Sequence, residues 1–302
     1  MTAAGARLKD IISRPDAVIA APVFDPLSTH LSARRGFEVA KLSGTVWKGA
    51  ELAQPDDLPL AYMSDLVDIS RRILRVADIC LMVDADDGGP SAVSVYRTVR
   101  ELEQVGVAAI ELEDNLVPRF YGEVEDRHGL VISQKEFVGK LQAAVDARRD
   151  DSTLIVARLV LRTYPDRDEA LARIVAYAEA GVDAIMLPGL GAPRDGRDDL
   201  QAIHAVTDLP LFALGLPWDV QTDAEFMRAN NVKVRYVSDF PLYRMAIKNM
   251  DDCLAYMAEG GDPADLDDRM GPLSLVRHAP ESVSQIEFFK NWSQKYVQLE
   301  DE

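Results

Sequence analysis

The chain has 302 residues, 48% of them apolar, which is enough for one large hydrophobic core. Fifty acidic residues against 33 lysines and arginines give a formal charge of −17, and this excess repels phosphate backbones and anionic membrane surfaces. The composition therefore argues against nucleic-acid and membrane partners. A small anionic substrate would need a metal ion or local arginines to reverse the field within its site.

The two cysteines, Cys80 and Cys253, are too few for a disulfide framework. The N-terminal sequence lacks the apolar core of a signal peptide, and no run approaches the roughly 18 apolar residues that a membrane helix requires. We therefore expect a reduced, cytoplasmic protein.

Short apolar runs recur along the chain, each followed by a longer segment of helical periodicity, and this alternation is typical of βα units around a parallel sheet. Helices predicted at 91–105 and 168–180 each end before a glycine, Gly106 or Gly181, that opens the next run. Eight such runs predict an α/β fold with a closed (β/α)8 TIM barrel. The predicted strands lie near 17–24, 39–43, 79–83, 109–112, 154–159, 184–187, 211–214 and 234–237.

After the eighth predicted strand, residues 241–258 have the pattern of a helix, and glycines and prolines then interrupt the chain. A last amphipathic helix is predicted near 281–298, with more apolar surface than a lone tail should expose. We expect it to pack on the barrel or on a neighbouring subunit. No linker composition divides the chain, so we predict a catalytic barrel domain over 1–258 and a C-terminal helical extension over 259–302.

The first predicted strand ends in Phe24 and Asp25 and not in a Gly-x-Gly-x-x-Gly turn, so a dinucleotide site is not expected. In a barrel the reacting groups lie at the C-terminal ends of the strands. Both residues are therefore candidates for contact with a substrate.

Acidic residues are concentrated after the third and fourth predicted strands. Asp84 and Asp86 are two residues apart, so on a continuing strand they point to the same side, and Glu111 and Glu113 repeat this spacing on the next strand. Mg²⁺ prefers oxygen ligands and keeps several waters, so one or two direct carboxylates suffice, whereas clustered acids without a cation repel one another. Alternatively, each acid caps a helix or is solvated in a loop, which is commoner for a single Asp. Two adjacent strand ends with the same pattern favour a metal site.

Candidate anion-binding groups follow the second and fifth strands. Ser43, Gly44 and Thr45 offer hydroxyls and backbone N–H groups, and Gly44 has no side chain to keep an anion away, although a Ser-Gly pair alone is usually just a turn. Arg158 ends a buried run and needs a carboxylate partner. That partner is either an acid of the site or a substrate carboxylate.

The segment 115–129 after the fourth strand is long and of mixed charge, so it is either a lid over the substrate or a passive insertion. The four histidines, His30, His128, His204 and His278, have no close spacing, which argues against a histidine-rich zinc site. Only His128, within this segment, is a candidate for proton transfer.

Seven short segments are weak singly but specific in their order and spacing. They are Val23-Phe24-Asp25-Pro26-Leu27-Ser28, Leu42-Ser43-Gly44, Asp84-Ala85-Asp86-Asp87-Gly88, Arg97-Thr98-Val99-Arg100-Glu101-Leu102-Glu103, Ile110-Glu111-Leu112-Glu113-Asp114, Ala157-Arg158 and Ala246-Ile247-Lys248. At these residues the chain resembles the isocitrate lyase/phosphoenolpyruvate mutase superfamily, over nearly its whole length.

The resemblance implies a Mg²⁺-dependent barrel, with Mn²⁺ as an alternative cation, that acts on 2-oxo or 2-hydroxy acids. It implies a homotetramer, a dimer of dimers in which the eighth helix is swapped between paired subunits. It also implies Asp84 as a direct metal ligand, Asp86 and Glu113 as holders of metal-bound waters, and Asp56 or Asp57 as a further acid.

The resemblance implies that Ser43, Gly44 and Arg158 bind the oxo-acid end of the substrate. The segment 118–122, which contains Tyr121, lacks the cysteine that the lyases of the superfamily carry there, and it looks most like the oxaloacetate decarboxylase branch. The chain departs from that branch where polar substrate contacts are expected, so we expect a substrate larger or less polar than oxaloacetate. The departures are Asp87-Gly88-Gly89-Pro90, Val160, Leu216 near Trp218, and Asp239.

We predict an enzyme that holds a 2-oxo acid on Mg²⁺ and breaks the bond to the adjacent carbon, leaving a metal-bound enolate, most simply a decarboxylase of oxaloacetate or a related acid. The alternatives are a carbon–carbon lyase or hydrolase of a substituted 2-oxo or 2-hydroxy dicarboxylate, a phosphonopyruvate-type P–C bond enzyme, and, in a different class, an inactive barrel that binds a metabolite. The predicted catalytic residues are Arg158, Ser43, Tyr121 and His128. The predicted substrate contacts are Phe24, Asp25, Ser43, Gly44, Thr45, Arg158, Leu216, Trp218 and Asp239. The predicted metal site comprises Asp84, Asp86, Glu113 and Asp56.

Overall fold

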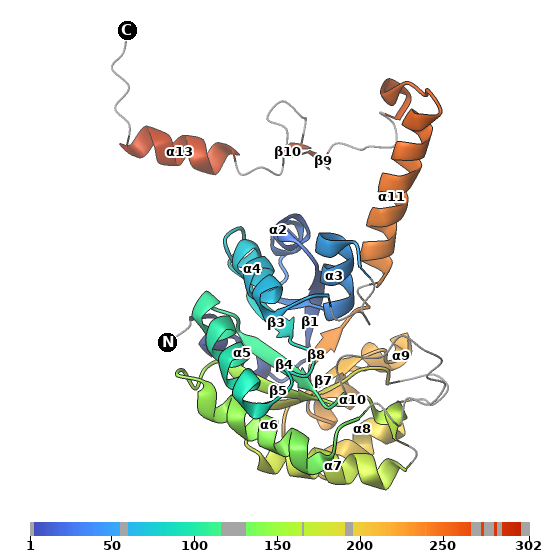
Figure 1. The fold of residues 1–302 in the computed structure, drawn as a ribbon. Coiled ribbons are helices and arrows are strands. Elements are labelled where there is room, and N and C mark those ends of the chain that lie inside the picture. The colour runs from blue at the N-terminus through green and yellow to red at the C-terminus, as the bar shows by residue number, and fades with distance from the viewer. Residues whose placement is uncertain are drawn as a thin grey trace. The chain divides into compact units, whose positions relative to one another are not determined.

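Eight parallel strands, paired in sequence order and closed by pairing of β8 with β1, form a barrel (Figure 1). The computed structural model describes residues 3–54, 60–115, 131–164, 166–190, 196–238, 240–266, 273–274, 281–282 and 286–296. The strands are β1 Val18–Val23, β2 Val39–Leu42, β3 Cys80–Asp84, β4 Ala109–Glu113, β5 Leu154–Arg158, β6 Ala184–Leu187, β7 Leu211–Leu214 and β8 Val232–Tyr236. The predicted TIM barrel is confirmed, and each predicted strand matches within two residues at either end.

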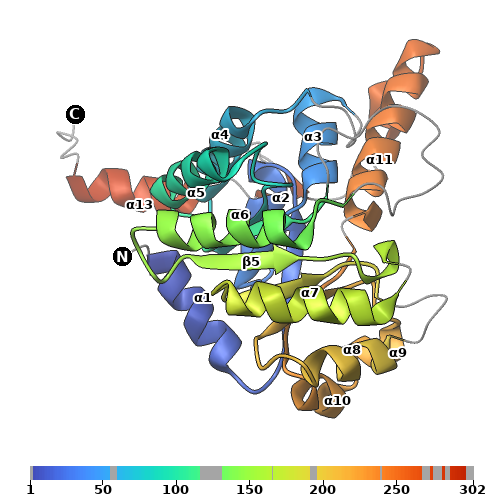
Figure 2. The same cartoon turned by 60° about the horizontal axis from the view of Figure 1, so that its bottom comes forward.

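Helices surround the barrel, and Figure 2 shows α6 and α7 running along either side of β5. The helices of this part of the chain are α1 Ala3–Ser13, α2 Pro26–Arg34, α3 Gly44–Leu52, α4 Met63–Leu74, α5 Ala92–Val105, α6 Gln134–Ala147, α7 Arg167–Glu179, α8 Arg197–His204, α9 Trp218–Gln221, α10 Ala224–Ala229 and the start of α11 Phe240–Ala258, with a 3-10 turn η2 at Leu161–Thr163.

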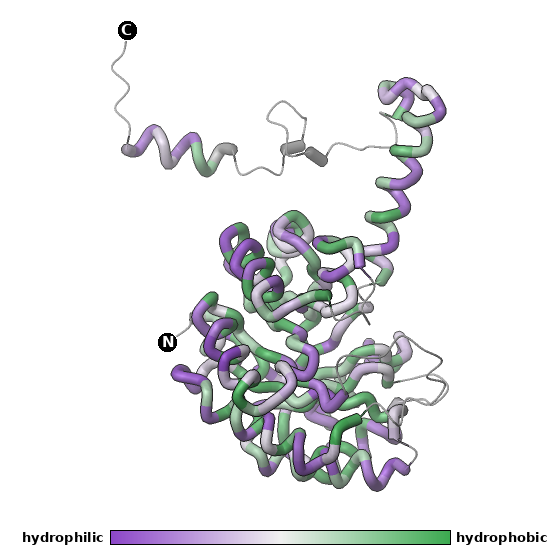
Figure 3. The backbone as a smooth tube through the Cα atoms, viewed as in Figure 1, coloured by the Kyte–Doolittle hydropathy of each residue, from purple (hydrophilic) through white to green (hydrophobic). Residues whose placement is uncertain are grey.

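Local sequence explains where these helices begin and end. The hydroxyl of Ser91 accepts a hydrogen bond from a backbone N–H of the first turn of α5, and α5 ends at Gly106, whose φ of 92° lies in the left-handed region that glycine tolerates. Val95, Val99 and Leu102 form its buried face. Figure 3 shows hydrophilic and hydrophobic residues alternating along the coiled segments of the tube. The helices predicted at 91–105 and 168–180 are confirmed as α5 and α7.

The core has two layers, which follow from the period of two along each strand. One cluster fills the interior of the barrel and includes Met82, Val156 and Phe212. The other lies between the strands and the helices and includes Leu81 and Val83, the neighbours of Met82 in sequence. Inward-pointing positions can therefore be identified from their sequence spacing alone.

Helix α1 covers the N-terminal end of the barrel, although the sequence analysis did not predict it. Leu8 and Ile11 are fully or almost fully buried and belong to the same cluster as the interior side chain of Val39. Gly5 packs so closely that a Cβ there would lie 2.4 Å from the backbone oxygen of Ser152. With this end closed, chemistry is left to the C-terminal ends of the strands.

The chain divides into two compact units, residues 1–243 and 244–302. The second contains most of α11, a 3-10 turn η3 at Pro263–Leu266, the strand pair β9 Leu273–Ser274 and β10 Glu281–Ser282, and α13 Ile286–Tyr296. The predicted start of the helix near 281–298 is wrong, because Glu281–Ser282 form β10 and α13 begins at Ile286. The domain boundary after residue 258 and the helix swap stay predictions. Among the described residues, no helix combines the length and apolarity needed to cross a bilayer.

Candidate active site

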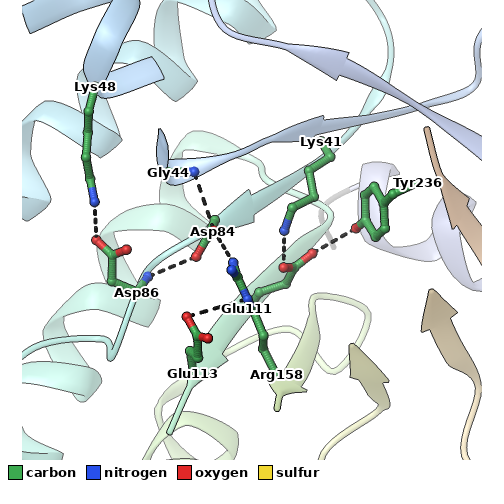
Figure 4. Close-up of polar contacts among 9 residues, drawn as sticks. All are labelled: Lys41, Gly44, Lys48, Asp84, Asp86, Glu111, Glu113, Arg158 and Tyr236. Atoms are coloured by element: carbon green, nitrogen blue, oxygen red, sulfur yellow. Dashed lines mark hydrogen bonds and ion pairs between the residues drawn. The ribbon is translucent and has the colours of Figure 1, made fainter. Parts of the chain in front are cut away.

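The interior of the barrel changes from apolar to charged towards the C-terminal ends of the strands. On β3, Asp84 has the inward parity of Met82, and on β4 both Glu111 and Glu113 have the inward parity of Ala109. Arg158 lies opposite Glu113 in the β4–β5 pairing. Figure 4 shows these side chains meeting at one end of the barrel.

The turn after β3 is tied to the end of β4. The backbone N–H of Glu113 donates to the carbonyl oxygen of Asp86 over 2.8 Å, and the N–H of Asp86 donates to Oδ1 of Asp84 over 3.2 Å. Asp86 has a φ of 50°, a left-handed conformation that is uncommon for a residue other than glycine. These bonds hold the Asp86 carboxylate beside that of Asp84.

The two carboxylates converge on Gly44, the first residue of α3. Its N–H lies 3.4 Å from Oδ2 of Asp84, and a Cβ at this position would lie 3.3 Å from Oδ1 of Asp86 and 3.5 Å from Oδ2 of Asp84. The glycine therefore leaves room for a small group between the backbone and both acids. Ser43 precedes it as the N-cap residue, and its hydroxyl makes no capping bond.

Arg158 is the positive centre of the site. Its Nη1 forms an ion pair with Asp84, and its Nε lies 3.5 Å from Oε2 of Glu113. Burial works to lower the pKa of Arg158, but Asp84, Glu113 and Glu111 raise it well above its usual value. Burial has the opposite effect on Asp84 and would raise its pKa, but the charges of Arg158 and two lysines hold this pKa below its usual range. Both groups are therefore charged at neutral pH, and the partner sought for Arg158 is an acid of the site.

Two lysines that the sequence analysis did not single out complete the cluster. Nζ of Lys48 on α3 lies 2.8 Å from Oδ2 of Asp86, and Lys41 on β2 forms a buried ion pair with Glu111. Tyr236 on β8 donates its hydroxyl to Oε1 of Glu111 over 2.8 Å, and burial, followed by the charge of Glu111, raises its pKa well above the usual value. Their sequence spacing could have revealed both lysines. Lys41 stands two residues before Ser43, and Lys48 lies one helical turn after Gly44.

The acids that follow the inward ones in sequence face away from the barrel interior. Asp87 accepts a hydrogen bond from Nζ of Lys140 over 2.9 Å. Asp114 accepts hydrogen bonds from the hydroxyls of Tyr164 and Tyr177, the latter over 2.6 Å. Burial raises the pKa of Asp114 in spite of these bonds. The acidic runs after β3 and β4 are thus each split between two environments.

The remaining predicted residues are not all brought to this cluster. Asp25 caps α2 by accepting the N–H of Ser28 over 2.6 Å, and Phe24 packs edge-to-face on Tyr243. Leu216 is buried, and Trp218, the first residue of α9, is 67% exposed. Thr45 is the second residue of α3. Asp56, Asp57, Tyr121, His128 and Asp239 lie outside the described residues.

The donor set of the site fits Mg²⁺. Within the described part of the chain, no three His, Cys, Asp or Glu side chains form a ready-made metal cage, since Arg158 and Lys48 pair with the candidate acids. Mg²⁺ does not need such a cage, because it takes one or two carboxylates and keeps several waters. Oxygens of Asp84 and Asp86 approach one point beside Gly44, so Asp84 as a direct ligand and Asp86 as a holder of metal-bound water would meet this requirement.

Comparison with known proteins shows the family to which this barrel belongs. The family model of phosphoenolpyruvate phosphomutase matches residues 8–258. The chain belongs to this family. It is 32% identical to an oxaloacetate decarboxylase of Paraburkholderia xenovorans over 96% of this chain and 93% of the relative. The predicted membership of the isocitrate lyase/phosphoenolpyruvate mutase superfamily is confirmed.

Solved structures show the same fold over nearly the whole chain. A phosphoenolpyruvate phosphomutase from Streptomyces platensis subsp. rosaceus superposes with a TM-score of 0.81 at 26% identity, covering 97% of this chain and 99% of that one. A phosphonopyruvate hydrolase in complex with oxalate and Mg²⁺ superposes with a TM-score of 0.76 at 23% identity, covering 98% and 99%. The chain is therefore an enzyme of the isocitrate lyase/phosphoenolpyruvate mutase superfamily.

Proposed function

We propose that the protein is a Mg²⁺-dependent decarboxylase of oxaloacetate or a related 2-oxo acid. The observation that carries the proposal is the convergence of the Asp84 and Asp86 carboxylates on the backbone of Gly44, beside the buried guanidinium of Arg158. The similarity to oxaloacetate decarboxylases over nearly the whole chain supports this choice of substrate class.

Asp84 would hold Mg²⁺ directly, and Asp86 and Glu113 would hold its waters. When bound, the ion would draw electron density from the 2-oxo group of the substrate. Mn²⁺ is an alternative with the same oxygen preference.

The chain's own groups bind and orient the acid. The N–H of Gly44 at the start of α3 faces Oδ2 of Asp84, and together with the hydroxyl of the N-cap residue Ser43 it would bind the substrate carboxylate. Arg158 would supply the positive charge that stabilises the enolate formed as carbon dioxide leaves. Decarboxylation needs no base to begin, and the proton returns from water or from a side chain, with Tyr121 and His128 as the predicted candidates.

The proposal can be tested by the release of pyruvate from oxaloacetate with Mg²⁺, corrected for the rate in buffer with the same ion. We expect enzyme-dependent release that chelation by EDTA abolishes and that Asp84→Asn lowers by at least about 100-fold. Asp78→Asn is the matched control, because the side chain of Asp78 is 94% exposed and lies two residues before β3 begins. Equal turnover by the wild type and Asp84→Asn would contradict the assigned ligand.

A wider screen addresses the alternatives. If Mg²⁺ binds but oxaloacetate is inert, substituted 2-oxo and 2-hydroxy dicarboxylates and phosphonopyruvate are the next substrates to test. Mg²⁺ binding without turnover of any of them would favour the inactive metabolite-binding barrel.

We also propose a cytoplasmic homotetramer in which residues 244–302 pack on another subunit. Exposed aromatic side chains on α13 support this arrangement, namely Phe288, Phe289, Trp292 and Tyr296. Light scattering after size exclusion is expected to give a mass near four times 33.3 kDa, and a monomer would contradict it.

A further inference from the structure

Three buried polar side chains of the barrel interior have no part in the proposed reaction. They are Lys41 on β2, Glu111 on β4 and Tyr236 on β8, and none of them is more than 5% exposed. Lys41 forms an ion pair with Oε2 of Glu111, and the hydroxyl of Tyr236 donates to Oε1 over 2.8 Å. Each oxygen of the Glu111 carboxylate thus has a partner of its own.

This group forms a separate layer of the barrel interior. Interior side chains of a TIM barrel are arranged in layers that alternate between odd and even strands. The three residues come from the even-numbered β2, β4 and β8, whereas Asp84 and Arg158 come from the odd-numbered β3 and β5. The hydroxyl of Tyr236 also lies 3.5 Å from the sulfur of Met82, two residues before Asp84 on β3. The polar layer therefore lies between the apolar interior and the charged site.

The register of the strands brings Glu111 close to the path of the Arg158 side chain. Arg158 on β5 pairs with Asp84 on β3, so its guanidinium crosses β4, the strand between them (Figure 4). On β4, Glu113 lies opposite Arg158 in the pairing, and Glu111 lies opposite Asp84. Burial lowers the pKa of the guanidinium, and the charge of Glu111 is one of three carboxylate charges that raise it.

We propose that Glu111 is a positioning residue: held by Lys41 and Tyr236, its carboxylate keeps the guanidinium of Arg158 directed across β4 towards Asp84 and the substrate. The inference rests on the proposed function for its effect on turnover. It assigns Glu111 an action through Arg158 and no contact with the substrate.

Burial argues for such a role over a contribution to stability. Replacing a buried ion pair by apolar residues of similar volume is often neutral or stabilising, so the pair of Lys41 and Glu111 is weak evidence for stability. Two partners on its two oxygens mean that the Glu111 carboxylate cannot rotate without losing one of them. Its charge therefore stays at a fixed point beside the layer that contains Arg158.

Glu111 is also the acid that remains available to Arg158 in the proposed reaction. The proposed function gives Asp84 and Glu113 to the metal ion and its waters, and their attraction for the guanidinium falls once their charge is shared with a cation. Glu111 has no metal role in that proposal. Its carboxylate therefore continues to hold Arg158 when the substrate is bound.

The test is steady-state decarboxylation of oxaloacetate with Mg²⁺, expressed per folded molecule. Tyr236→Phe removes one hydrogen bond with little change of shape, and we expect kcat to fall about tenfold while KM stays within about threefold. Glu111→Gln should lower kcat by about 100-fold. In the Arg158→Met background it should add no further loss, because the two residues act as a unit.

A second variant covers the case in which Glu111→Gln does not fold because it leaves Lys41 buried without its counter-charge. Lys41→Met/Glu111→Gln removes both charges and keeps an acceptor for the Tyr236 hydroxyl. We expect it to unfold at a urea concentration close to that of the wild type and to show the same loss of kcat as Glu111→Gln. Wild-type kcat in this variant and in Tyr236→Phe would overturn the inference.

Tyr177→Phe is the matched control, because it also removes a buried hydroxyl from a buried carboxylate, that of Asp114 outside the inner cluster. Its kcat should stay within about threefold of the wild type. A tenfold loss in this control as well would mark a general effect of a lost buried hydroxyl and would overturn the inference. So would a further loss of about 100-fold when Glu111→Gln is added to Arg158→Met.

A further measurement needs no turnover. Urea unfolding of the metal-free wild type, Glu111→Gln, Arg158→Met and the double variant forms a thermodynamic cycle. If Glu111 holds Arg158, the double variant loses less stability than the sum of the two single losses. Additive losses would overturn the inference and leave the proposed function intact. No turnover by the wild type would overturn the proposed function, and the unfolding cycle would still decide whether Glu111 holds Arg158.

Discussion

Asp84 and Glu113 face the barrel interior and Asp86 lies beside Asp84, whereas Asp87 and Asp114, which directly follow Asp86 and Glu113 in the chain, contact the surrounding helices. The inner acids meet Arg158 and Lys48 at the closed ring of strand ends, where a metal ion and a substrate could enter. The outer acids are enclosed by side chains of α6 and α7 and have no such access. Acids that look equivalent in sequence thus divide into a group suited to chemistry and a group that holds the fold together.

The contacts of the outer acids, Asp87 and Asp114, also hold in place the backbone that carries the inner acids. Lys140 donates both to the Asp87 carboxylate and, over 3.1 Å, to its backbone oxygen. Arg173 donates to the backbone oxygen of Ile132 and to the hydroxyl of Tyr177, which in turn donates to Asp114. The outer contacts therefore fix the backbone from which the inner acids project.

The largest expected effect concerns the inner group. Arg158→Met removes the positive charge beside Asp84 and Glu113, and we expect kcat/KM for oxaloacetate to fall by about 1,000-fold, because the charge of the enolate loses its counter-charge. Steady-state kinetics measure this loss. A decrease of less than about tenfold would show that Arg158 balances charge without taking part in the reaction.

The second expected effect concerns the stability of the outer group. Lys140→Met leaves the Asp87 carboxylate buried without its cation, and we expect the free energy of unfolding to fall by about 3 kcal/mol. Urea unfolding followed by circular dichroism measures it. The exposed pair Arg228–Asp16 provides the control, since Arg228→Met should cost at most about 1 kcal/mol. Equal losses in the two variants would contradict the role of burial.

A third change separates stability from activity. Asp114→Ala leaves the hydroxyls of Tyr164 and Tyr177 without their acceptor, and we expect a loss of about 1–3 kcal/mol in unfolding free energy. Turnover per folded molecule should stay within about threefold of the wild type, because Asp114 does not touch the inner cluster and the pairing of β4 with β5 still holds the backbone of Glu113. A loss of turnover as large as that of Asp84→Asn would remove the distinction between the two groups.

The smallest expected effect is the pH dependence of stability. Burial raises the pKa of Asp114 in the folded state, so the folded protein binds this proton more tightly than the unfolded chain does. Its contribution is fully present below the unfolded value of about 3.9 and is lost as the pH rises through the raised folded pKa. The difference in unfolding free energy between the wild type and Asp114→Asn should therefore shift against the wild type from pH 4 towards pH 7. A difference that is constant over this range would contradict the raised pKa.

The fold could be predicted because the hydrophobic periodicity and the positions of helix-ending glycines indicate the same elements along the chain. Glycines such as Gly106 mark helix ends, and short apolar runs mark the strands. These local patterns recur along the chain and indicate eight strands separated by helices. Helix α1 was missed although Leu8, Ile11 and Ile12 have helical spacing, because it closes the barrel and belongs to no βα unit.

The site could be predicted only in part. Asp84, Asp86, Glu113 and Arg158 were recognised because strand ends gather inward-pointing residues. Lys41 and Lys48 were missed, since a charge in an apolar strand or on a helix does not reveal its partner without the register of the neighbouring elements. Asp25 illustrates the opposite case: its position suggested substrate contact, and the structure shows it capping α2. A contact of Asp25 with the substrate stays a prediction.

The central claim is that the inner acids bind a divalent metal ion and the outer acids do not. It is tested most directly by titrating Mn²⁺ into metal-free wild type, Asp84→Asn and Asp114→Asn and counting bound ions by electron paramagnetic resonance. The account predicts one site per chain in the wild type and in Asp114→Asn, and at least about tenfold weaker binding in Asp84→Asn. Binding that is unchanged in Asp84→Asn, or no binding by the wild type, would contradict it.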